Sequence, residues 1–509
     1  MNHFLSILII VALSSATASA ARPNLLLITV DDMNADSMGS YGCPISDLTP
    51  QMDAVVRRGL RFQFAHVQVG NCMPGRNTMW SGLFPHNHGV EGFYQVNDAA
   101  YPHLVDVMNA AGYFTAIRGK ASHSTPYTPY DWDKILETDV DGKPAHLKDA
   151  ASYGGSVQEG ISAAAKAEQP FCLMINISDP HKPFFAQGKN GATVPDKHPP
   201  SRVIEASEVP VPGFLFDDPV VRKELAHYYS SVRRADDCVG AVMNALDESG
   251  QADQTIVMFL SDHGMALPFA KTQLYHHSTH TPLAVSIPGV TPPATLDSAH
   301  MVSAVDLMPT IVDLCEIEAD LQFDGRSFAP ILKGETQTGR DYVIKEYNEN
   351  AGGSRDPMRG IQTRKFLYLF NAWSNGKRVM ATATTGTPTY RRLKQLATEN
   401  VELASRHSLY QFRVPEEFFD VQNDPDCLVN LISDPQHQAT ITELRETLLS
   451  ELRRTSDPIA EIFANRHDAA AREAFVVASE AAADARRAAK REQAAKRKQQ
   501  AKRKQDAKN

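Results

Sequence analysis

The sequence has few cysteines, no long apolar run after its first residues, and no basic excess over most of its length. Its six cysteines are scattered through 509 residues without the spacing of a disulfide framework, so disulfides do not define the fold. Beyond the N-terminal segment, no stretch approaches the roughly 18 apolar residues of a membrane span, and none is expected. The content of 42% hydrophobic and 22% charged residues excludes a disordered or collagen-like chain.

Charge is distributed unevenly along the chain. The net charge is −9, but residues 486–509 carry 11 Lys or Arg against Glu492 and Asp506. This tail is therefore +9 and the remainder −18. An acidic body is a poor candidate for reading nucleic acid, and no nucleic-acid partner is expected. From about Arg466 the chain is rich in Ala, Lys and Arg without Pro or Gly, which predicts a helical or frayed tail with no core-forming face.

The first 20 residues have the composition of a signal peptide. Leu5 to Leu13 form an apolar segment, and Ala18-Ser19-Ala20 supplies the small residues of a cleavage site. We expect cleavage after about Ala20 and export of the mature protein to a periplasmic, secreted or lysosome-like compartment. A buried N-terminal helix or a short uncleaved anchor are the alternatives.

Four apolar runs share one composition. They cover residues 24–30, 113–118, 170–177 and 255–260 and are rich in Ile, Val, Leu and Phe. Continuous rather than alternating hydrophobicity is typical of strands buried on both faces of a parallel sheet. The runs therefore predict strands of a parallel sheet that is covered on both faces.

Helical patterns lie between these runs. Residues 48–59, 103–112 and 220–250 have apolar side chains at three- and four-residue spacing, and the first begins with Thr49-Pro50, a capping residue before Pro. Strand–helix alternation predicts an α/β fold, with a large, mostly parallel sheet sandwiched by helices.

After about residue 340 the pattern changes. Residues 359–370 and 408–412 to 418–421 predict short antiparallel strands, and 438–453 predict one closing helix. We therefore expect a smaller C-terminal α+β unit. The predicted limits are 1–20 for the signal peptide, 21–375 for the main domain, 376–465 for the α+β subdomain and 466–509 for the basic tail.

Each of the four apolar runs ends in polar residues. In parallel α/β sheets, ligands bind beyond the carboxyl ends of the strands, so these residues are candidates for one site. They are Asp31, Asp32, Lys120, His123, Asp179, His181, Asp262 and His263.

The segment Cys72-Met-Pro-Gly-Arg76, with Gly82 further on, resembles the signature of the sulfatase family, Cys-x-Pro-x-Arg followed by Gly. In that family the Cys is oxidised to formylglycine, whose hydrated aldehyde is the nucleophile. Alone, these residues could also be an ordinary turn with a thiol. Further segments match the family in chain order: Asp31-Asp32, Gly119-Lys120 with His123, Asp179-Pro-His181, Asp262-His263 and Lys271.

Within the family, the resemblance is strongest to the sulfamidase branch, which removes N-linked sulfate from glucosamine. It covers residues 22–465 and is carried by 259–264, 281–285, 419–425 and 455–458; the tail has no counterpart. The resemblance implies an alkaline-phosphatase-like fold. Lys271 stands where sulfamidase has Arg, and these two cations are not interchangeable around a sulfate. Arg359 and the pair His276-His277 are expected at the substrate-pocket wall.

The resemblance also implies one calcium ion per chain. Its ligands would be Asp31, Asp32, Asp262, His263 and the formylglycine made from Cys72. His263 stands where many relatives have Asn, and imidazole suits transition metals, whereas calcium prefers oxygen. Calcium remains the expected ion.

A sulfate ester or sulfamate is an anion that repels nucleophiles. The site must therefore neutralise its charge, supply a nucleophile and protonate the leaving group. The cation and the basic residues would neutralise the charge, and the histidines would exchange protons. The resemblance implies attack by residue 72, departure of the alcohol or amine helped by His181 with Lys271, and proton removal by His123. The candidate catalytic residues are Cys72, Arg76, Lys120, His123, His181 and Lys271.

Each assignment has a simpler structural alternative. Asp31 and Asp32 could cap a helix, Lys120 could be a surface charge, and His181 could shape a turn.

At the level of function, the expected sulfatase acts on a sulfated carbohydrate, either N-sulfoglucosamine or an O-sulfated sugar. Its partners would be that saccharide and a formylglycine-generating maturation enzyme. The alternatives are a phosphate or phosphonate monoester hydrolase and a non-catalytic polyanion-binding protein. The basic tail either binds sulfated polysaccharide or is a solvated helix.

Overall fold

The computed structural model describes residues 22–138 and 142–506, with side chains described as far as Glu492. The predicted signal peptide lies outside the described residues. The strands are β1 (Asn24–Val30), β2 (Leu60–His66), β3 (Phe114–Arg118), β4 (Lys134–Ile135), β5 (Phe171–Ile177), β6 (Thr255–Ser261), β7 (Leu283–Ser286), β8 (Thr295–Ser303), β9 (Tyr342–Glu349), β10 (Arg355–Thr363), β11 (Phe366–Asn371) and β12 (Glu416–Asp420). The helices are α1 (Pro50–Arg57), α2 (Cys72–Ser81), α3 (Pro85–His88), α4 (Leu104–Ala110), α5 (Ala150–Ala167), α6 (Pro219–Glu248), α7 (His276–Thr279), α8 (Leu307–Leu314), α9 (Ala329–Leu332), α10 (Pro388–Leu396), α11 (Val401–Phe412), α12 (Gln438–Arg454), α13 (Ala460–Ala464) and α14 (Ala469–Asp506).

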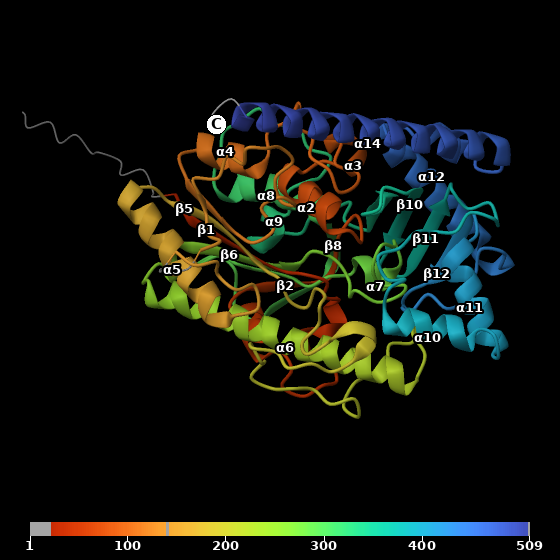
Figure 1. The fold of residues 1–509 in the computed structure, drawn as a ribbon, viewed down its shortest axis with the longest axis horizontal. Helices are drawn as coiled ribbons and strands as arrows, with labels where there is room; N and C mark the ends of the chain where they lie inside the picture. Colours follow the sequence, from red (N-terminus) through yellow and green to blue (C-terminus); the bar gives the residue numbers. More distant parts are fainter. Residues whose placement is uncertain (1–21, 139–141, 507–509) are drawn as a thin grey trace, which may run out of the picture.

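The large sheet has eight strands in the order β4-β3-β5-β1-β6-β7-β2-β8 (Figure 1). The four predicted apolar runs become β3, β5, β1 and β6, which are adjacent and mutually parallel. Only the pairings of β7 with β6 and β2 are antiparallel in this sheet. The prediction of a mixed, mostly parallel sheet is therefore confirmed.

Strand register brings the ends of the central strands level with one another. Val30 pairs with both Ile177 and Ser261 across the two neighbouring strands. The loops that follow remain joined, because the Asp31 amide donates to the Asp179 carbonyl (3.2 Å) and the Asp262 amide donates to the Val30 carbonyl (3.1 Å). The polar residues that follow these strands consequently meet at one edge of the sheet.

Helices cover both faces of this sheet, as predicted. Alternate residues of β1 point to opposite sides: Leu26, Ile28 and Val30 pack with α1, α5 and α6, whereas Leu25 and Leu27 pack with α2, α4, α8 and α9. In Figure 1, α5 and α6 lie below the sheet and α2, α4, α8 and α9 above it. Burial of both faces explains why the central strands are continuously apolar.

A second, antiparallel sheet has the order β12-β11-β10-β9 and packs against α12 and α13. The predicted closing helix is α12. The sheet takes three strands from before residue 375 and one from after it, so the predicted domain limit at 375 divides it. A smaller unit that begins near residue 340, where the sequence pattern changes, contains the whole sheet. The domain limits themselves stay predictions.

The expectation of a strand at 408–412 is wrong, because these residues end helix α11. Asn400 caps this helix with its side-chain oxygen, which accepts from the Leu403 amide (3.0 Å). Tyr410 is buried in an edge-to-face contact with Phe269, 4.9 Å between ring centroids. The helix places this aromatic ring in the core. Five residues are too few for the sequence to distinguish a strand from the end of a helix.

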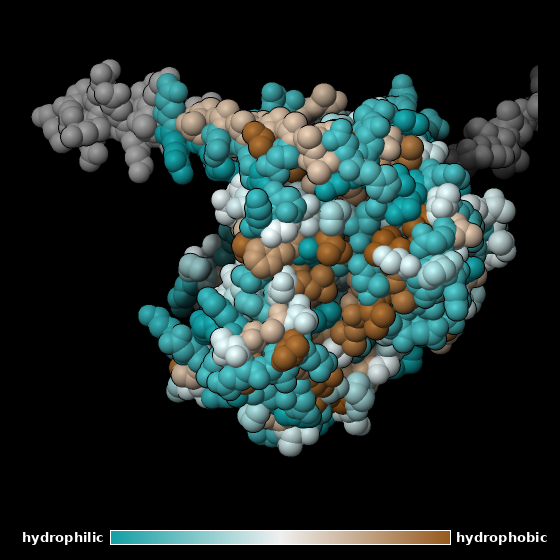
Figure 2. Space-filling model, turned by 90° about the vertical axis from the view of Figure 1, so that its right-hand side faces the viewer, coloured by the Kyte–Doolittle hydropathy of each residue, from teal (hydrophilic) through white to brown (hydrophobic). Residues whose placement is uncertain are grey.

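The tail also differs from expectation, because the first part of α14 has a core-forming face. Val476 and Ala483 are fully buried, and Phe475 packs against the core. Arg378 forms ion pairs with Glu473 (2.7 Å) and Glu480 (2.6 Å) of the helix. Figures 1 and 2 show α14 along the upper edge of the molecule. The residues that bury this face lie far away in sequence, so the tail's composition alone could not indicate docking.

All six cysteines lie in the described residues and are unpaired. None of the helices in the described part of the chain combines the length and apolarity needed to cross a membrane.

Candidate active site

Cys72 occupies the first position of α2, directly after Asn71, and faces the carboxyl edge of the large sheet. Every residue of α2 is buried, and Cys72 is only 2% exposed. Its Sγ lies 3.2 Å from His263 Nε2 and 4.0 Å from Lys271 Nζ. Burial would raise the pKa of this thiol, but Lys271, Lys120 and His263 outweigh burial and hold it well below its ordinary value. The site therefore stabilises negative charge at residue 72.

Three further side chains converge with Cys72 on one point. One ligand atom from each of Asp32, Cys72, Asp262 and His263 lies within 4.8 Å of the others, and all four residues are buried. Asp262 Oδ1 accepts from the Asp32 amide (2.9 Å), whereas its Oδ2 is buried without a hydrogen-bond partner. Burial raises the pKa of Asp262 to about 7, more than the nearby basic groups lower it. Asp262 Oδ2 lies 3.3 Å from Arg76 Nη2 and close to the other ligand atoms. A buried carboxylate oxygen among several ligand atoms fits a bound cation.

His263 presents one ring nitrogen to this cluster. Its Nδ1 lies 2.9 Å from the Gly264 carbonyl oxygen, which can only accept, so Nδ1 carries a proton and Nε2 faces the cluster. Gly264 permits this arrangement: a Cβ there would lie 2.0 Å from the His277 carbonyl oxygen. No side chain fits at 264 without moving the segment that follows Lys271.

Asp31 lies beside the cluster and joins two basic residues. It forms ion pairs with Arg76 and with Lys120, the latter at 2.6 Å. Arg76 is fully buried and also donates to Thr29 Oγ1 (3.0 Å) and Asn176 Oδ1 (2.5 Å). Asp31 is therefore a bridge between fixed positive charges, which hold its pKa well below its ordinary value despite its burial.

The backbone at this edge is strained. Asp32 (φ 64°), Lys120 (φ 54°) and Thr272 (φ 64°) all adopt the left-handed region, which residues with a side chain rarely enter. Such conformations cost about 1–3 kcal/mol each and concentrate at functional sites. Three such conformations lie next to the Cys72 pocket. They indicate that the fold holds these side chains in place although their backbone conformation is unfavourable.

His181 is held by groups behind it. Its Nδ1 lies 2.6 Å from the Lys182 carbonyl oxygen, and Lys148 Nζ donates to the His181 carbonyl (3.0 Å). Lys148 also pairs with Asp179 (2.5 Å), which receives a second ion pair from Arg234 (2.5 Å). The loop after β5 is consequently clamped by two cations from other elements.

A cavity of about 770 Å³ opens beside these residues and reaches both His181 and Lys120. Its lining also includes Lys148, Lys182 and Lys197, and among the described residues Asp196 is the only acidic one that lines it. The balance of charge in this cavity favours an anion.

His123 hydrogen-bonds to the side chain of Cys72. Its ring stands edge-on to Phe93, 5.5 Å between centroids, and its Nδ1 is buried without a hydrogen-bond partner. One nitrogen of this imidazole is therefore free for a further proton exchange within the site.

The structure thus brings every candidate residue to one edge of the sheet, but sequence reasoning missed the residues that position them. Asn176 had a signal, since it is a polar residue inside the apolar run that forms β5. Lys148, Arg234 and Phe93 had none, because they come from segments without a motif.

Arg359 is not at the pocket wall, and that expectation is wrong. Its side chain is 1% exposed and forms ion pairs with Asp457 (2.5 Å) and Glu346 (3.3 Å). Glu346 and Asp457, together with His86, form the second group of potential metal ligands in the described residues. Arg359 and the protonated ring of His86 already balance these carboxylates, so this group is an ion-pair network.

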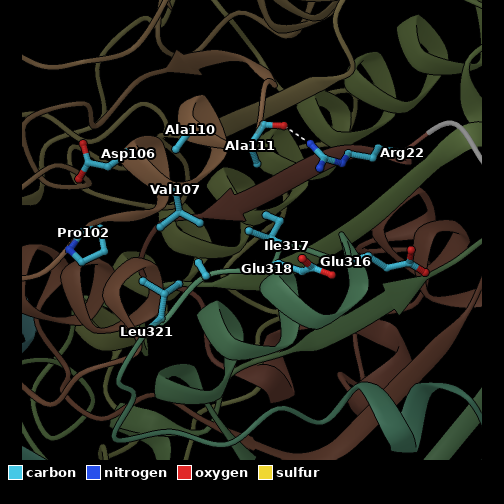
Figure 3. A pocket seen from close by; sticks show the side chains of 11 residues that line it. Arg22, Pro102, Asp106, Val107, Ala110, Ala111, Glu316, Ile317, Glu318 and Leu321 are labelled. Carbon is cyan, nitrogen blue, oxygen red and sulfur yellow. Dashed lines mark hydrogen bonds between the residues drawn. The ribbon is translucent and has the colours of Figure 1, made fainter. Parts of the chain in front are cut away.

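Another cavity, of about 650 Å³, lies between α4 and residues 316–321 (Figure 3). Arg22 precedes β1 and donates to the carbonyl of Ala111, which precedes β3. The cavity is therefore at the amino edge of the sheet, and none of the candidate residues lines it.

The buried thiol of Cys72, a group of potential cation ligands and converging basic side chains on an α/β fold fit a hydrolase for a tetrahedral anion. The sulfatase family model matches residues 23–317, more than half of the chain, and the chain belongs to this family. It is an enzyme that hydrolyses sulfate from its substrate. A second model, that of the N-sulphoglucosamine sulphohydrolase C-terminal region, matches residues 262–377.

Individual relatives agree with the family. The chain is 29% identical to human N-sulphoglucosamine sulphohydrolase over 471 residues, which cover 86% of this chain and 91% of that protein. It is 25% identical to an ulvan-active sulfatase of Formosa agariphila, covering 88% and 84% respectively.

Solved structures show the same fold. A protein in complex with D-glucosamine-2-N,6-O-disulfate superposes with a TM-score of 0.63 at 17% identity, covering 86% of this chain and 99% of that one. A phosphonate monoester hydrolase of Agrobacterium radiobacter gives 0.59 at 18% identity, covering 85% and 96%. At such identities these likenesses concern the fold alone.

Proposed function

We propose that this sulfatase removes sulfate from a terminal sulfated sugar, with N-sulfoglucosamine as its leading substrate and an O-sulfated hexose next. The observation that carries the proposal is the match of residues 262–377 to the N-sulphoglucosamine sulphohydrolase C-terminal model. The 29% identity to the human enzyme extends over 91% of that protein and supports it. Lys271 is the feature that counts against an N-sulfated substrate and for an O-sulfated one, because it offers a compact charge in place of the bidentate guanidinium of an Arg.

Residue 72 is the proposed nucleophile, after a maturation enzyme has oxidised Cys72 to formylglycine; the hydrated aldehyde then supplies a hydroxyl that attacks sulfur. Lys271 and Lys120 lie where negative charge develops, and Arg76 fixes Asp31 behind them. Cationic groups that are in place before the reaction stabilise this charge without reorganisation.

Two histidines are proposed to transfer the protons of the leaving group and of residue 72. His181 is proposed to protonate the departing amine or alcohol, since the cavity with room for a sugar opens beside it. His123 is proposed to accept a proton from residue 72, to which it already hydrogen-bonds. General acid–base groups of this kind each contribute about 10²–10⁴-fold to the rate.

The cation is proposed to be one calcium ion, held by Asp32, Asp262 and His263 with residue 72, and with Asp31 next to them. When bound, it would neutralise sulfate charge and orient the sulfate group. The convergence of four buried ligand-bearing side chains, with Asp262 Oδ2 accepting no hydrogen bond, supports a cation at this point. Carboxylate oxygens dominate the donor set, which favours calcium over a transition metal despite the imidazole.

The same proposal includes export, cleavage after about Ala20, and a catalytic domain that starts at residue 21. Formylglycine formation in an exported chain implies a maturation enzyme as a partner.

The substrate is tested by comparing kcat/KM for N-sulfoglucosamine and glucosamine 6-O-sulfate, with Cys72→Ala as the inactive control. We expect the N-sulfated sugar to be preferred. If the O-sulfated sugar is preferred by more than about tenfold, roughly 1.4 kcal/mol in transition-state binding, the N-sulfate assignment fails and the sulfatase assignment remains. Mass spectrometry of the peptide that contains residue 72 decides the nucleophile: an unmodified thiol in all molecules of active enzyme would refute it, and Cys172 in the core serves as the internal control.

A further inference from the structure

The docked part of α14 ends against two loops at the active site. The Arg486 guanidinium carbon lies 3.8 Å from the centre of the Tyr94 ring, and Arg486 forms an ion pair with Glu349. Arg487 donates to the Gly353 carbonyl oxygen. Tyr94 belongs to the loop that follows α3, Glu349 is the last residue of β9, and Gly353 lies in the connection between β9 and β10. Two adjacent arginines thus fasten the helix at a defined position.

Both loops contact residues of the site directly. Phe93, next to Tyr94, packs edge-on against His123 (5.5 Å between centroids). The Glu349 carbonyl accepts from Asn71 Nδ2 (2.9 Å), and Asn71 precedes Cys72. Arg486 is therefore connected to the proposed proton acceptor through Tyr94 and Phe93, and to the proposed nucleophile through Glu349 and Asn71.

From this anchor the helix continues and becomes strongly basic. Between Arg487 and Asp506 it extends for roughly 29 Å, at 1.5 Å per residue. This stretch contains acidic residues only at Glu492 and Asp506. Its basic residues are Lys490, Arg491, Lys496, Arg497, Lys498, Lys502, Arg503 and Lys504.

The charge of the rest of the protein is opposite to that of this helix end. The chain without residues 486–509 has a formal charge of −18, so the body repels polyanions in general. A polyanionic substrate reaches a site on such a body more readily if a cationic element starts beside the site.

We propose that the C-terminal half of α14, residues 490–506, is a binding arm for the sulfated polysaccharide whose end enters the active site. The arm holds the anionic chain by charge while the terminal sugar occupies the pocket, which raises the local concentration of chain ends. This inference rests on the proposed function, since it takes the substrate to be the end of a sulfated polymer. The position beside a sulfatase site favours polysaccharide over nucleic acid.

The test compares three forms of the full-length enzyme. The first is the unaltered chain. The second replaces Lys496, Arg497, Lys498, Lys502, Arg503 and Lys504 with Gln, which is also a good helix former. The third is a matched control that exchanges Lys and Arg at the same six positions and so keeps the charge. Each is assayed on a sulfated monosaccharide and on a heparin-type polymer, and its elution from heparin-agarose is measured.

We expect the Gln variant to act on the monosaccharide within about twofold of the unaltered enzyme, while its KM for the polymer rises about tenfold at low salt. The difference should vanish near 1 M salt, where the Debye length is only about 3 Å. The charge-keeping control should behave like the unaltered enzyme, and the Gln variant should elute from heparin at lower salt.

An unchanged polymer KM with unchanged heparin elution would overturn the proposal. An equal loss of activity on both substrates would also overturn it, because it would show a structural role. A third contrary result would be that duplex DNA displaces the enzyme from heparin as well as free heparin does. If the unaltered enzyme hydrolyses neither sugar, the proposed function fails, and the heparin elution of the three forms still decides whether the arm binds the polymer.

Discussion

The ammonium nitrogen of Lys271 lies 2.7 Å from Asp32 Oδ2 and 4.0 Å from the sulfur of Cys72. Lys271 thus connects the acidic cluster to the proposed nucleophile. Burial lowers the pKa of Lys271, but Asp32 and Cys72 outweigh it and raise that pKa above its ordinary value, so the lysine is charged throughout the physiological range.

We therefore expect Lys271→Ala to lower kcat/KM by about 10²–10³-fold, the usual cost of removing one charge-stabilising donor from a preorganised site. Lys271→Arg keeps the charge and should retain more activity than the alanine variant. Steady-state kinetics on one sulfated sugar is the measurement, with Lys377→Ala at an exposed position as the control. An alanine variant as active as the control would exclude Lys271 from the chemistry.

A second prediction concerns the cation. Calcium should stabilise the protein, by about 2.7 kcal/mol at a concentration of 100 Kd, and should raise its Tm. Asp262→Asn keeps the shape of the buried side chain but removes its charge, and we expect it to abolish both the calcium-dependent shift and turnover. Asp313→Asn, at an exposed position on α8, should leave both intact. Full turnover by enzyme stripped of metal would show that the ligand assignment is wrong.

The pair of His86 and Glu346 predicts a pH dependence of stability. His86 Nδ1 lies 2.7 Å from Glu346 Oε2, and its Nε2 lies 3.0 Å from the Thr455 carbonyl oxygen, so both ring nitrogens donate. Burial lowers the pKa of His86, but the effect of Glu346 is larger, so the pKa rises from 6.5 to about 9. The pKa of Glu346 falls from 4.5 to about 2, because Arg359 and His86 outweigh its burial.

A raised histidine pKa stabilises the fold fully below pH 6.5, and this contribution disappears as pH rises through about 9. A lowered glutamate pKa stabilises it above pH 4.5, and this contribution disappears toward pH 2. Between pH 4.5 and 6.5, His86→Ala should therefore lower the free energy of unfolding most, by about 3 kcal/mol. Denaturant titrations at pH 6 and pH 9.5 should show the loss shrinking at the higher pH, with His467→Ala as the exposed control. A loss that is equal at both pH values would contradict the ion pair.

Docking of α14 is tested by two neighbouring valines. Val476 is fully buried, whereas Val477 is 49% exposed. Val476→Ala should lower the free energy of unfolding by roughly 2 kcal/mol, and Val477→Ala should change it by less than about 0.5 kcal/mol. Equal effects in urea unfolding would mean that the helix does not pack on the body.

The sequence predicted the centre of the fold and the chemistry of the site. Continuous apolar runs indicated the four adjacent parallel strands, since burial on both faces leaves no room for alternation. Cys72, Asp262 and the other candidates could be found because they follow these runs or lie in a motif that matches the sulfatase family. The strand expected at 408–412 is wrong, because a segment of five residues does not distinguish a strand from the last turns of a helix.

Only the tertiary structure decided how these residues are held and what the tail does. Register across β5, β1 and β6 determines that Asp32 and Asp262 meet. Lys148 reaches the His181 loop from the turn before α5, and Arg234 reaches it from α6. The burial of Val476 likewise depends on partners more than a hundred residues away in sequence. The amino-acid sequence by itself determined which groups are present and at which strand ends, because composition and local periodicity are properties of neighbouring residues. Contacts between distant segments decided the rest, because charge, burial and distance at a site are properties of the packed chain.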